Sequence, residues 1–186
     1  MRAVFLDRDG VINRKAPEGE YIATWGDMRF LPGAFASVST LFRAGFQIIV
    51  VTNQRGIALG KVRLEDLEEM HRRMRARCSQ HGAIITDVYF CPHDISEHCS
   101  CRKPKPGMLL QAAEDHALDL SSCWMIGDAA SDLEAGRKAG CKTAWILPAA
   151  APQRIDLHAD LRAHNLPSAV RKILRAVAGR QSAEKT

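Results

Sequence analysis

The 186 residues include 46% hydrophobic ones, enough to bury one core of ordinary domain size, and we expect a single monomeric domain over residues 1–186. The net charge of +5 favours an anionic partner, but basic residues are not interleaved with aromatic ones, which argues against nucleic acid. No stretch approaches the roughly 20 apolar residues of a membrane span, and the N-terminus lacks signal-peptide features, so we expect a cytoplasmic protein without a membrane partner.

Short apolar runs with many β-branched residues predict five strands that are buried on both faces. In chain order they are Ala3 to Leu6, Phe46 to Thr52, Ile84 to Phe90, Cys123 to Ile126 and Thr143 to Leu147. Between and after them, apolar residues at helical spacing predict helices at Gly33 to Ala44, Arg63 to His81, Gly107 to Leu118, Ser131 to Ala139 and Pro167 to Ala178. This alternation predicts an α/β fold with a Rossmann-like, doubly wound and mainly parallel sheet.

Three segments fall outside this alternation. The segment from Arg14 to Arg29 is expected to form a loop or flap beside the first strand, because it contains one proline and two glycines. Ala149 to Pro152 is expected to be a linker into a C-terminal strand and helix appendage at about residues 150–178. Gly179 to Thr186 is expected to be a frayed tail.

Polar side chains follow the first, second and fourth predicted strands. Asp7 and Asp9 end the first strand, Thr52 ends the second, and Asp128 ends the fourth, with Asp132 one helical turn later. In an open parallel sheet, ligands bind beyond the carboxyl ends of the strands, so these groups are expected to meet at one edge. Clustered carboxylates repel one another unless a cation holds them, and hard oxygen ligands favour Mg²⁺.

Lys103, which follows the third predicted strand, adds a positive charge to this edge. A carboxylate nucleophile, Mg²⁺, a hydroxyl group and a lysine are the parts that form an aspartyl-phosphate. Asp9, two residues beyond Asp7, can protonate the leaving alkoxide and later deprotonate the hydrolytic water. We therefore expect a phosphoryl-transfer site for a small phosphorylated metabolite.

The segment CPHDISEHCSCRKPKPG contains a CxH pair and a CxC pair separated by five residues. Three thiolates and one imidazole complete a tetrahedral Zn²⁺ shell without an open position, so the predicted zinc ion is structural. The expected ligands of this zinc loop, residues 91–101, are Cys91, His93, Cys99 and Cys101, with His98 as the competitor of His93. The ion would hold the loop that leads into Arg102 and Lys103.

FLDRDGVI, VVTNQ, CRKPKPGM and MIGDAASD resemble the four motifs of the haloacid dehalogenase-like phosphohydrolase superfamily over about residues 3–147. The resemblance implies that Asp7 is the nucleophile, that Asp9 is the general acid and base, and that Thr52 and Lys103 hold the phosphoryl group. It implies Mg²⁺ binding by Asp7, the Asp9 backbone carbonyl and Asp128, with support from Asp132. It also implies a haloacid dehalogenase-like fold, and the intervals between the motifs leave no room for a large cap domain.

DRDG, TNQRGIALGK, the CxH and CxC pairs and CRKPKPGM resemble one branch, the D-glycero-D-manno-heptose 1,7-bisphosphate 7-phosphatases of lipopolysaccharide heptose synthesis. This resemblance implies removal of the 7-phosphate and recognition of the sugar bisphosphate by Arg102. It also implies that the site is lined by residues of the second motif and the flap, namely Thr52, Asn53, Gln54, Arg55, Glu18 and Tyr21.

Three alternatives stay open at this point. The short zinc loop also resembles the histidinol-phosphate phosphatases, and Ala129 stands where heptose phosphatases often have lysine, although GIALG and KPGM favour the heptose branch. A phosphoryl-accepting signalling module uses the same chemical groups, but it has its acceptor on the third strand, whereas Asp7 ends the first. A zinc-containing nucleic-acid binder would be distinguished by a steep dependence on salt.

Overall fold

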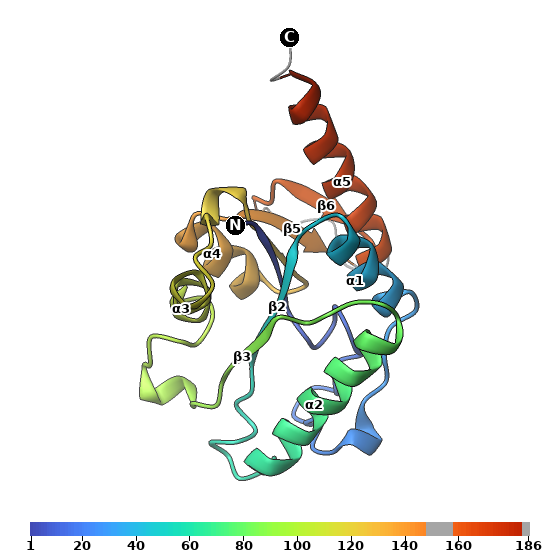
Figure 1. The fold of residues 1–186 in the computed structure, drawn as a ribbon. Coiled ribbons are helices and arrows are strands. Elements are labelled where there is room, and N and C mark those ends of the chain that lie inside the picture. Colours follow the sequence, from blue (N-terminus) through green and yellow to red (C-terminus); the bar gives the residue numbers. More distant parts are fainter. Residues whose placement is uncertain (148–157, 184–186) are drawn as a thin grey trace.

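Six strands form one sheet in the order β3-β2-β1-β4-β5-β6, and each neighbouring pair is parallel (Figure 1). The computed structural model describes residues 1–147 and 158–183. The strands are β1 (Ala3–Leu6), β2 (Gln47–Asn53), β3 (Asp87–Cys91), β4 (Trp124–Gly127), β5 (Lys142–Ile146) and β6 (Leu161–Ala163). The α-helices are α1 (Ala34–Arg43), α2 (Leu64–Gln80), α3 (Gly107–Asp115), α4 (Ala130–Ala139) and α5 (Leu166–Ala183), and short 3-10 helices are η1 (Trp25–Asp27), η2 (Ile95–Glu97) and η3 (Leu120–Ser122).

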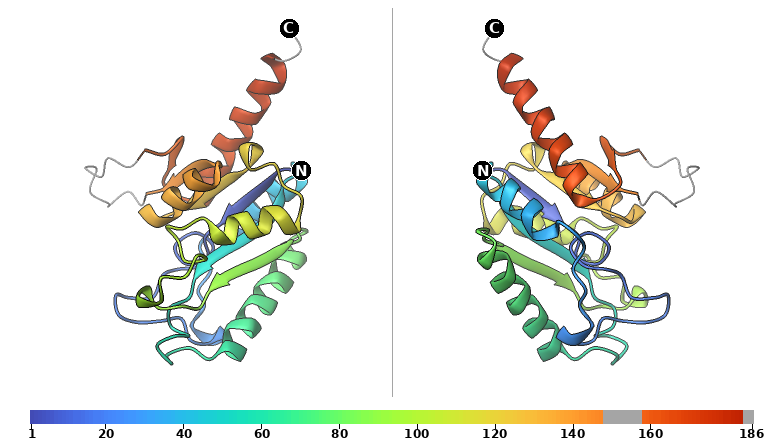
Figure 2. Two further views of the ribbon diagram at one scale, coloured as in Figure 1. Left: turned by 90° about the vertical axis from the view of Figure 1, so that its left-hand side faces the viewer. Right: turned by 90° about the vertical axis from the view of Figure 1, so that its right-hand side faces the viewer.

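Helices cover both faces of the sheet, with α1, α2 and α5 on one side and α3 and α4 on the other (Figure 2). Alternate residues of each strand enter the two cores. On β1, Val4 and Leu6 pack with the first group of helices, whereas Ala3 and Phe5 pack with the second group. The predicted doubly wound α/β sheet is therefore confirmed, and burial on both faces explains why its central strands are continuous apolar runs.

The boundaries differ from the prediction at three elements. β3 begins at Asp87 rather than Ile84, whose side chain is 60% exposed, and as an edge strand β3 is only partly buried rather than covered on both faces. Helix α3 ends at Asp115, before the predicted Leu118, because Ala117 adopts a left-handed backbone conformation with φ of +48°. Helix α5 continues through Gly179 to Ala183, since one glycine in a helix costs only about 1 kcal/mol.

The C-terminal segment belongs to the same layers as the rest of the described chain. Strand β6 pairs with β5, and helix α5 packs against α1 on one face of the sheet. The segment that the sequence predicts as an appendage thus extends the sheet by one strand. The predicted linker from Ala149 to Pro152 lies outside the described residues, as does the end of the predicted tail.

The flap from Arg14 to Arg29 is tied to the loop that follows β1. The Arg14 N–H donates to the Arg29 carbonyl at 2.8 Å, and the Leu31 N–H donates to the Ile12 carbonyl at 2.9 Å. Apart from η1, the flap has no regular structure. It therefore stands beside the carboxyl end of β1, as expected.

Among the described residues, none of the helices combines the length and apolar character that a membrane crossing requires.

Candidate active site

The carboxyl ends of β2, β1 and β4 lie side by side and place a buried lysine between two aspartates. The Lys103 ammonium lies 2.8 Å from Asp7 Oδ1 and 2.6 Å from Asp132 Oδ1, and it donates to the Val51 carbonyl at 2.8 Å. All three charged side chains are almost completely buried. A lysine from the third motif therefore binds carboxylates from the first and fourth motifs.

Burial and the neighbouring charges shift the pKa values of Asp7 and Lys103. Burial raises the pKa of Asp7 to about 7, although the charge of Lys103 acts in the opposite direction. Burial by itself would lower the pKa of Lys103, but the carboxylates of Asp7 and Asp132 raise it above the ordinary value. The lysine thus stays protonated, and the site carries more negative than positive charge when its carboxyl groups are ionised.

Asp128 completes a three-carboxylate cluster that fits a divalent cation. One carboxylate oxygen from each of Asp7, Asp128 and Asp132 lies within 4.8 Å of the other two. Asp128 Oδ1 is buried and has no hydrogen-bond partner, whereas Asp128 Oδ2 lies 2.7 Å from the Lys15 ammonium. A buried unpaired carboxylate oxygen is unfavourable, so this donor set fits Mg²⁺, which prefers hard oxygen ligands.

A glycine allows the loop after β1 to approach this cluster. Gly10 has φ of +96°, and a Cβ atom at this position would lie 2.1 Å from Asp128 Oδ2. Any side chain at residue 10 would therefore displace the Asp128 carboxylate and strain the backbone. The glycine of the DRDG motif is therefore required because the loop after β1 passes close to Asp128, which follows β4.

Four hydrogen bonds hold the Asp9 carboxylate. The Arg8 guanidinium donates through Nε at 3.2 Å and Nη2 at 2.9 Å, Asn13 Nδ2 donates at 2.7 Å, and Gln54 Nε2 donates at 2.9 Å. Burial opposes ionisation of Asp9, but the charge and hydrogen bonds of Arg8, with those of Asn13 and Gln54, hold the pKa of Asp9 below its ordinary value. Asp9 is therefore ionised and tightly oriented in the free site.

The second motif contributes Thr52, Asn53 and Gln54. Thr52 is 1% exposed, and its Oγ1 accepts a hydrogen bond from Gln54 Nε2 at 2.9 Å. Gln54 therefore links Thr52 to Asp9 and is itself buried, whereas the sequence suggested only a substrate contact. The Asn53 side chain accepts from the Lys103 N–H at 3.1 Å and donates to the Lys103 carbonyl at 3.0 Å.

Two adjoining cavities open onto these residues. A cavity of about 170 Å³ is lined by Asp7, Asp9, Lys15, Thr52, Asn53, Lys103, Ala129, Ser131 and Asp132. A neighbouring cleft of about 280 Å³ shares Asp9, Lys15 and Asn53 with it and is further lined by Arg8, Ala16, Glu20, Tyr21, Ile22, Gln54, Arg55 and Arg102. The first cavity is large enough for a phosphoryl group, and the second can hold the remainder of a small ester.

The flap residues that line the cleft differ in part from those expected. Tyr21 borders the cleft, whereas Glu18 is exposed and does not line either cavity. Glu20 and Lys15 line it instead, and sequence reasoning missed both because the flap has no periodicity from which to read side-chain direction. Arg55 and Arg102 border the cleft as expected, and Arg55 also forms an ion pair with Asp94.

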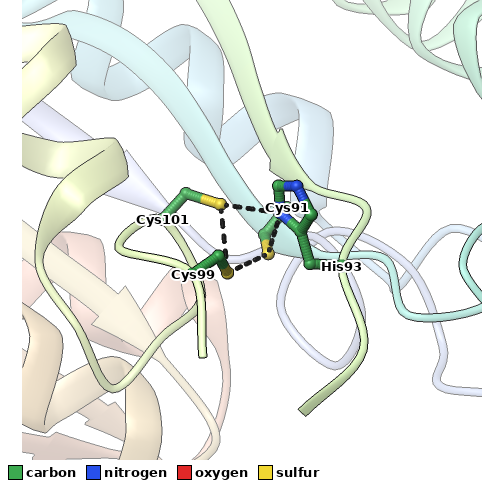
Figure 3. A group of neighbouring side chains, drawn as sticks. All are labelled: Cys91, His93, Cys99 and Cys101. Atoms are coloured by element: carbon green, nitrogen blue, oxygen red, sulfur yellow. Dashed lines mark hydrogen bonds between the residues drawn. The ribbon is translucent and has the colours of Figure 1, made fainter. Parts of the chain in front are cut away.

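The zinc loop brings together three cysteines and one histidine (Figure 3). Cys91 Sγ lies 3.5 Å from Cys99 Sγ, Cys99 Sγ lies 3.4 Å from Cys101 Sγ, and His93 Nδ1 lies 3.2 Å from Cys101 Sγ. A tetrahedral Zn²⁺ ion separates two sulfur ligands by about 3.8 Å, so four groups at these distances fit one ion. His98 is exposed and lies outside the cluster, which favours His93 as the fourth ligand.

Comparisons with known proteins agree with this geometry. A family model described as HAD-hydrolase-like matches residues 100–169. The D-glycero-β-D-manno-heptose-1,7-bisphosphate 7-phosphatase of Pseudomonas aeruginosa is 42% identical over 139 residues, which are 75% of this chain and 77% of that protein. The protein of the same name from Neisseria meningitidis serogroup A is 34% identical over 167 residues, 90% and 86% of the two chains.

A solved structure with this fold contains magnesium and phosphate. The crystal structure of D,D-heptose 1,7-bisphosphate phosphatase from B. bronchiseptica, complexed with magnesium and phosphate, has a TM-score of 0.84 to this chain and 27% sequence identity. The match covers 95% of this chain and 99% of that one, so nearly the whole fold is shared.

Proposed function

The chain belongs to the haloacid dehalogenase-like hydrolases, in the family of the D-glycero-β-D-manno-heptose-1,7-bisphosphate 7-phosphatases, and we propose that it removes the 7-phosphate of that sugar bisphosphate. It is a phosphoric monoester hydrolase. The proposed reaction serves the synthesis of lipopolysaccharide heptose. Because its substrate is a phosphorylated metabolite, we place the enzyme in the cytoplasm.

The observation that carries the proposal is the contact between Asp7 and Lys103. The ammonium, 2.8 Å from Asp7 Oδ1, offsets negative charge where a carboxylate must approach an anionic ester. A carboxylate oxygen of Asp7 attacks phosphorus, the bond from phosphorus to the ester oxygen breaks, and an aspartyl-phosphate forms. Water then attacks this phosphorus, which releases inorganic phosphate and regenerates Asp7.

Asp9 moves the protons for both halves of this reaction. The negative charge of the incoming phosphate raises the pKa of the Asp9 carboxyl, so that it takes up a proton and donates it to the leaving alkoxide. The Asp9 carboxylate then accepts a proton from the hydrolytic water. Gln54, which donates to both Asp9 and Thr52, aligns this group with the hydroxyl that binds the phosphoryl oxygens.

Mg²⁺ would be held by the carboxylates of Asp7 and Asp128, which cluster with the supporting Asp132. The family resemblance adds the Asp9 backbone carbonyl as a further ligand. When bound, this ion draws charge from the phosphoryl oxygens. Asp132 also accepts a hydrogen bond from the Ala129 N–H at 3.0 Å, which fixes the first turn of α4 beside the cluster. Ala129, the residue after Asp128, therefore contributes its backbone N–H to this contact. Its side chain carries no charge that could bind a substrate.

The cleft beside the cavity supports the assignment of a sugar bisphosphate. Lys15, Arg55 and Arg102 border it, whereas Glu20 is its one acidic residue besides Asp9 among the described lining residues. The excess of positive charge suits a substrate that keeps a second phosphate outside the reacting centre. Tyr21, Asn53 and Glu20 offer groups that can bind sugar hydroxyls.

The cysteine cluster is proposed as a structural zinc site. Cys91, His93, Cys99 and Cys101 fill four tetrahedral positions, which leaves none for water or substrate. The ion would fix the backbone that runs directly into Arg102 and Lys103. It therefore supports the cleft without taking part in the reaction.

A phosphate-release assay tests the proposed substrate. With Mg²⁺ present, heptose 1,7-bisphosphate should give a kcat/KM at least about 10-fold higher than fructose bisphosphate or histidinol phosphate. Histidinol phosphate has no second phosphate to bind the charged cleft, and fructose bisphosphate carries its two phosphates on a shorter sugar. Asp7→Asn should abolish release from every substrate while the circular dichroism spectrum stays unchanged. A preference for histidinol phosphate would reject the substrate, and unchanged turnover by Asp7→Asn would reject the mechanism.

A further inference from the structure

Arg8, between the two aspartates of the first motif, has a buried side chain. Its exposed fraction is 1%, although a guanidinium carries a full charge at any accessible pH. A buried charge is tolerated only when its N–H groups have acceptors, and a guanidinium can only donate. Its acceptors are the Asp9 carboxylate and the ring of His71.

The contact with Asp9 uses one edge of the guanidinium. Nε and Nη2 donate to separate oxygens of the carboxylate, and Asn13 and Gln54 each supply one further hydrogen bond. Four donors match the roughly four lone-pair sites of a carboxylate, so the plane of Asp9 is determined by its neighbours. Arg8 contributes two of these bonds and the positive charge.

The contact with His71 holds the opposite edge. Arg8 Nη1 lies 3.2 Å from His71 Nε2, and because Arg8 can only donate, Nε2 is the acceptor and the ring proton lies on Nδ1. Burial, with a further contribution from Arg8, lowers the pKa of His71 to about 3, which is consistent with a neutral ring. His71 lies on α2, and the centroid of its ring is 5.7 Å from the centroid of the Phe90 ring.

We propose that His71 is a positioning residue for the phosphatase reaction, which acts through Arg8 to orient the carboxylate of Asp9. The inference rests on the proposed role of Asp9 as the acid that protonates the leaving oxygen. His71 does not border either cavity of the candidate active site, so it reaches the reaction only through the guanidinium. Loss of its Nε2 acceptor leaves a buried N–H group unpaired and allows the guanidinium to turn.

A packing role for His71 makes a different prediction from a positioning role. General-acid catalysis matters most when the leaving oxygen is a strong base, and it matters little when the leaving group is already stable as an anion. A packing defect in α2 would lower the hydrolysis of all substrates alike. A misplaced Asp9 would lower only the hydrolysis of esters with poor leaving groups.

The experiment compares two substitutions of similar size. His71→Gln keeps an acceptor that can reach Arg8, whereas His71→Met has a similar shape without it. For His71→Met, kcat/KM for phenyl phosphate should fall roughly 10- to 100-fold, whereas kcat/KM for 4-nitrophenyl phosphate, with its more acidic phenol, should stay within about threefold of the wild-type value. For His71→Gln, both values should stay within about threefold. The ratio kcat/KM is used because it depends only on the steps up to and including release of the phenol, and not on later hydrolysis of the aspartyl-phosphate.

Equal losses on both esters, no loss on phenyl phosphate, or a glutamine variant as impaired as the methionine variant would each overturn the proposal. If His71→Met does not fold, His71→Asn, whose amide is too short to reach Arg8, takes its place in the comparison with His71→Gln. A wild-type enzyme that hydrolyses both aryl esters but not heptose bisphosphate would reject the proposed substrate and leave this inference standing.

Discussion

Asn53 holds the backbone of Lys103 at both of its polar groups. The asparagine Oδ1 accepts from the lysine N–H at 3.1 Å, and its Nδ2 donates to the lysine carbonyl at 3.0 Å. A residue at the end of β2 thereby fixes the segment that follows the zinc loop. Because the Lys103 ammonium must meet two carboxylates and a carbonyl at the same time, small movements of this segment would break those contacts.

Asn53→Ala should therefore lower kcat by roughly 10- to 100-fold, because a loosened Lys103 no longer offsets the charge of Asp7 in the transition state. The zinc content and the unfolding temperature should change little, since the cysteine cluster keeps its ligands. Steady-state kinetics and metal analysis of the same sample check both expectations. A variant with wild-type kcat would show that the backbone contact does not position the lysine.

Gly10→Ala should weaken Mg²⁺ binding by at least about 10-fold, because the new methyl group pushes Asp128 out of the carboxylate cluster. A suitable control is Gly140→Ala. Gly140 also has a positive φ, +87°, but a Cβ atom there would have no neighbour within 4 Å. Both variants should share the backbone strain, and only Gly10→Ala should lose Mg²⁺ affinity in titration calorimetry. Equal affinities in the two variants would contradict the close approach of Gly10 to Asp128.

Cys99→Ser should lose about one zinc ion per chain and lower the stability of the loop before Arg102, because serine is a poor zinc ligand and the remaining three groups hold the ion weakly. Cys78→Ser is the matched control, since Cys78 lies on α2 with its side chain buried and is not part of the cluster. It should keep its zinc. Metal analysis that finds no zinc in the purified wild-type protein would reject the structural role of the loop.

The parts of this site that sequence could predict are those that lie at strand ends or carry their own ligand chemistry. Asp7 and Asp128 follow the apolar runs of β1 and β4, and parallel topology brings such ends together. The cysteine spacing similarly predicts a metal cluster from the preferences of the ion alone. In both cases the information is local, and the fold needs only to be a parallel sheet.

Other features depend on tertiary packing that has no local signal. Lys15 and Glu20 reach the cleft because the irregular flap folds over it, and no periodicity determines which flap residues point inward. His71 occupies a buried position of an amphipathic helix, where the pattern predicts only a core residue. Its partner Arg8 could not be identified as buried from sequence, because the guanidinium finds both acceptors only after α2 packs against the sheet.

The neutral, buried state of His71 also predicts how stability depends on pH. Its pKa is lowered to about 3 in the folded chain, below the ordinary value of 6.5, so the unfolded chain binds a proton over this interval that the folded chain does not. The contribution of His71 is therefore fully present above pH of about 6.5 and is lost as the pH falls towards 3. Between pH 7.5 and pH 5, protonation of an ordinary histidine stabilises the unfolded chain, and so lowers the free energy of unfolding, by about 2 kcal/mol.

Asp7 acts in the opposite direction, because its raised pKa lets the folded chain bind a proton first as the pH falls below about 7. The test must therefore compare variants rather than follow one protein. The free energy of unfolding in urea, measured at pH 7.5 and pH 5, should fall by about 2 kcal/mol more in the wild type than in His71→Gln, which has no titrating group at this position. Parallel pH dependences in the two proteins would mean that His71 is protonated in the folded chain, and its Nε2 could then not accept the hydrogen bond from Arg8.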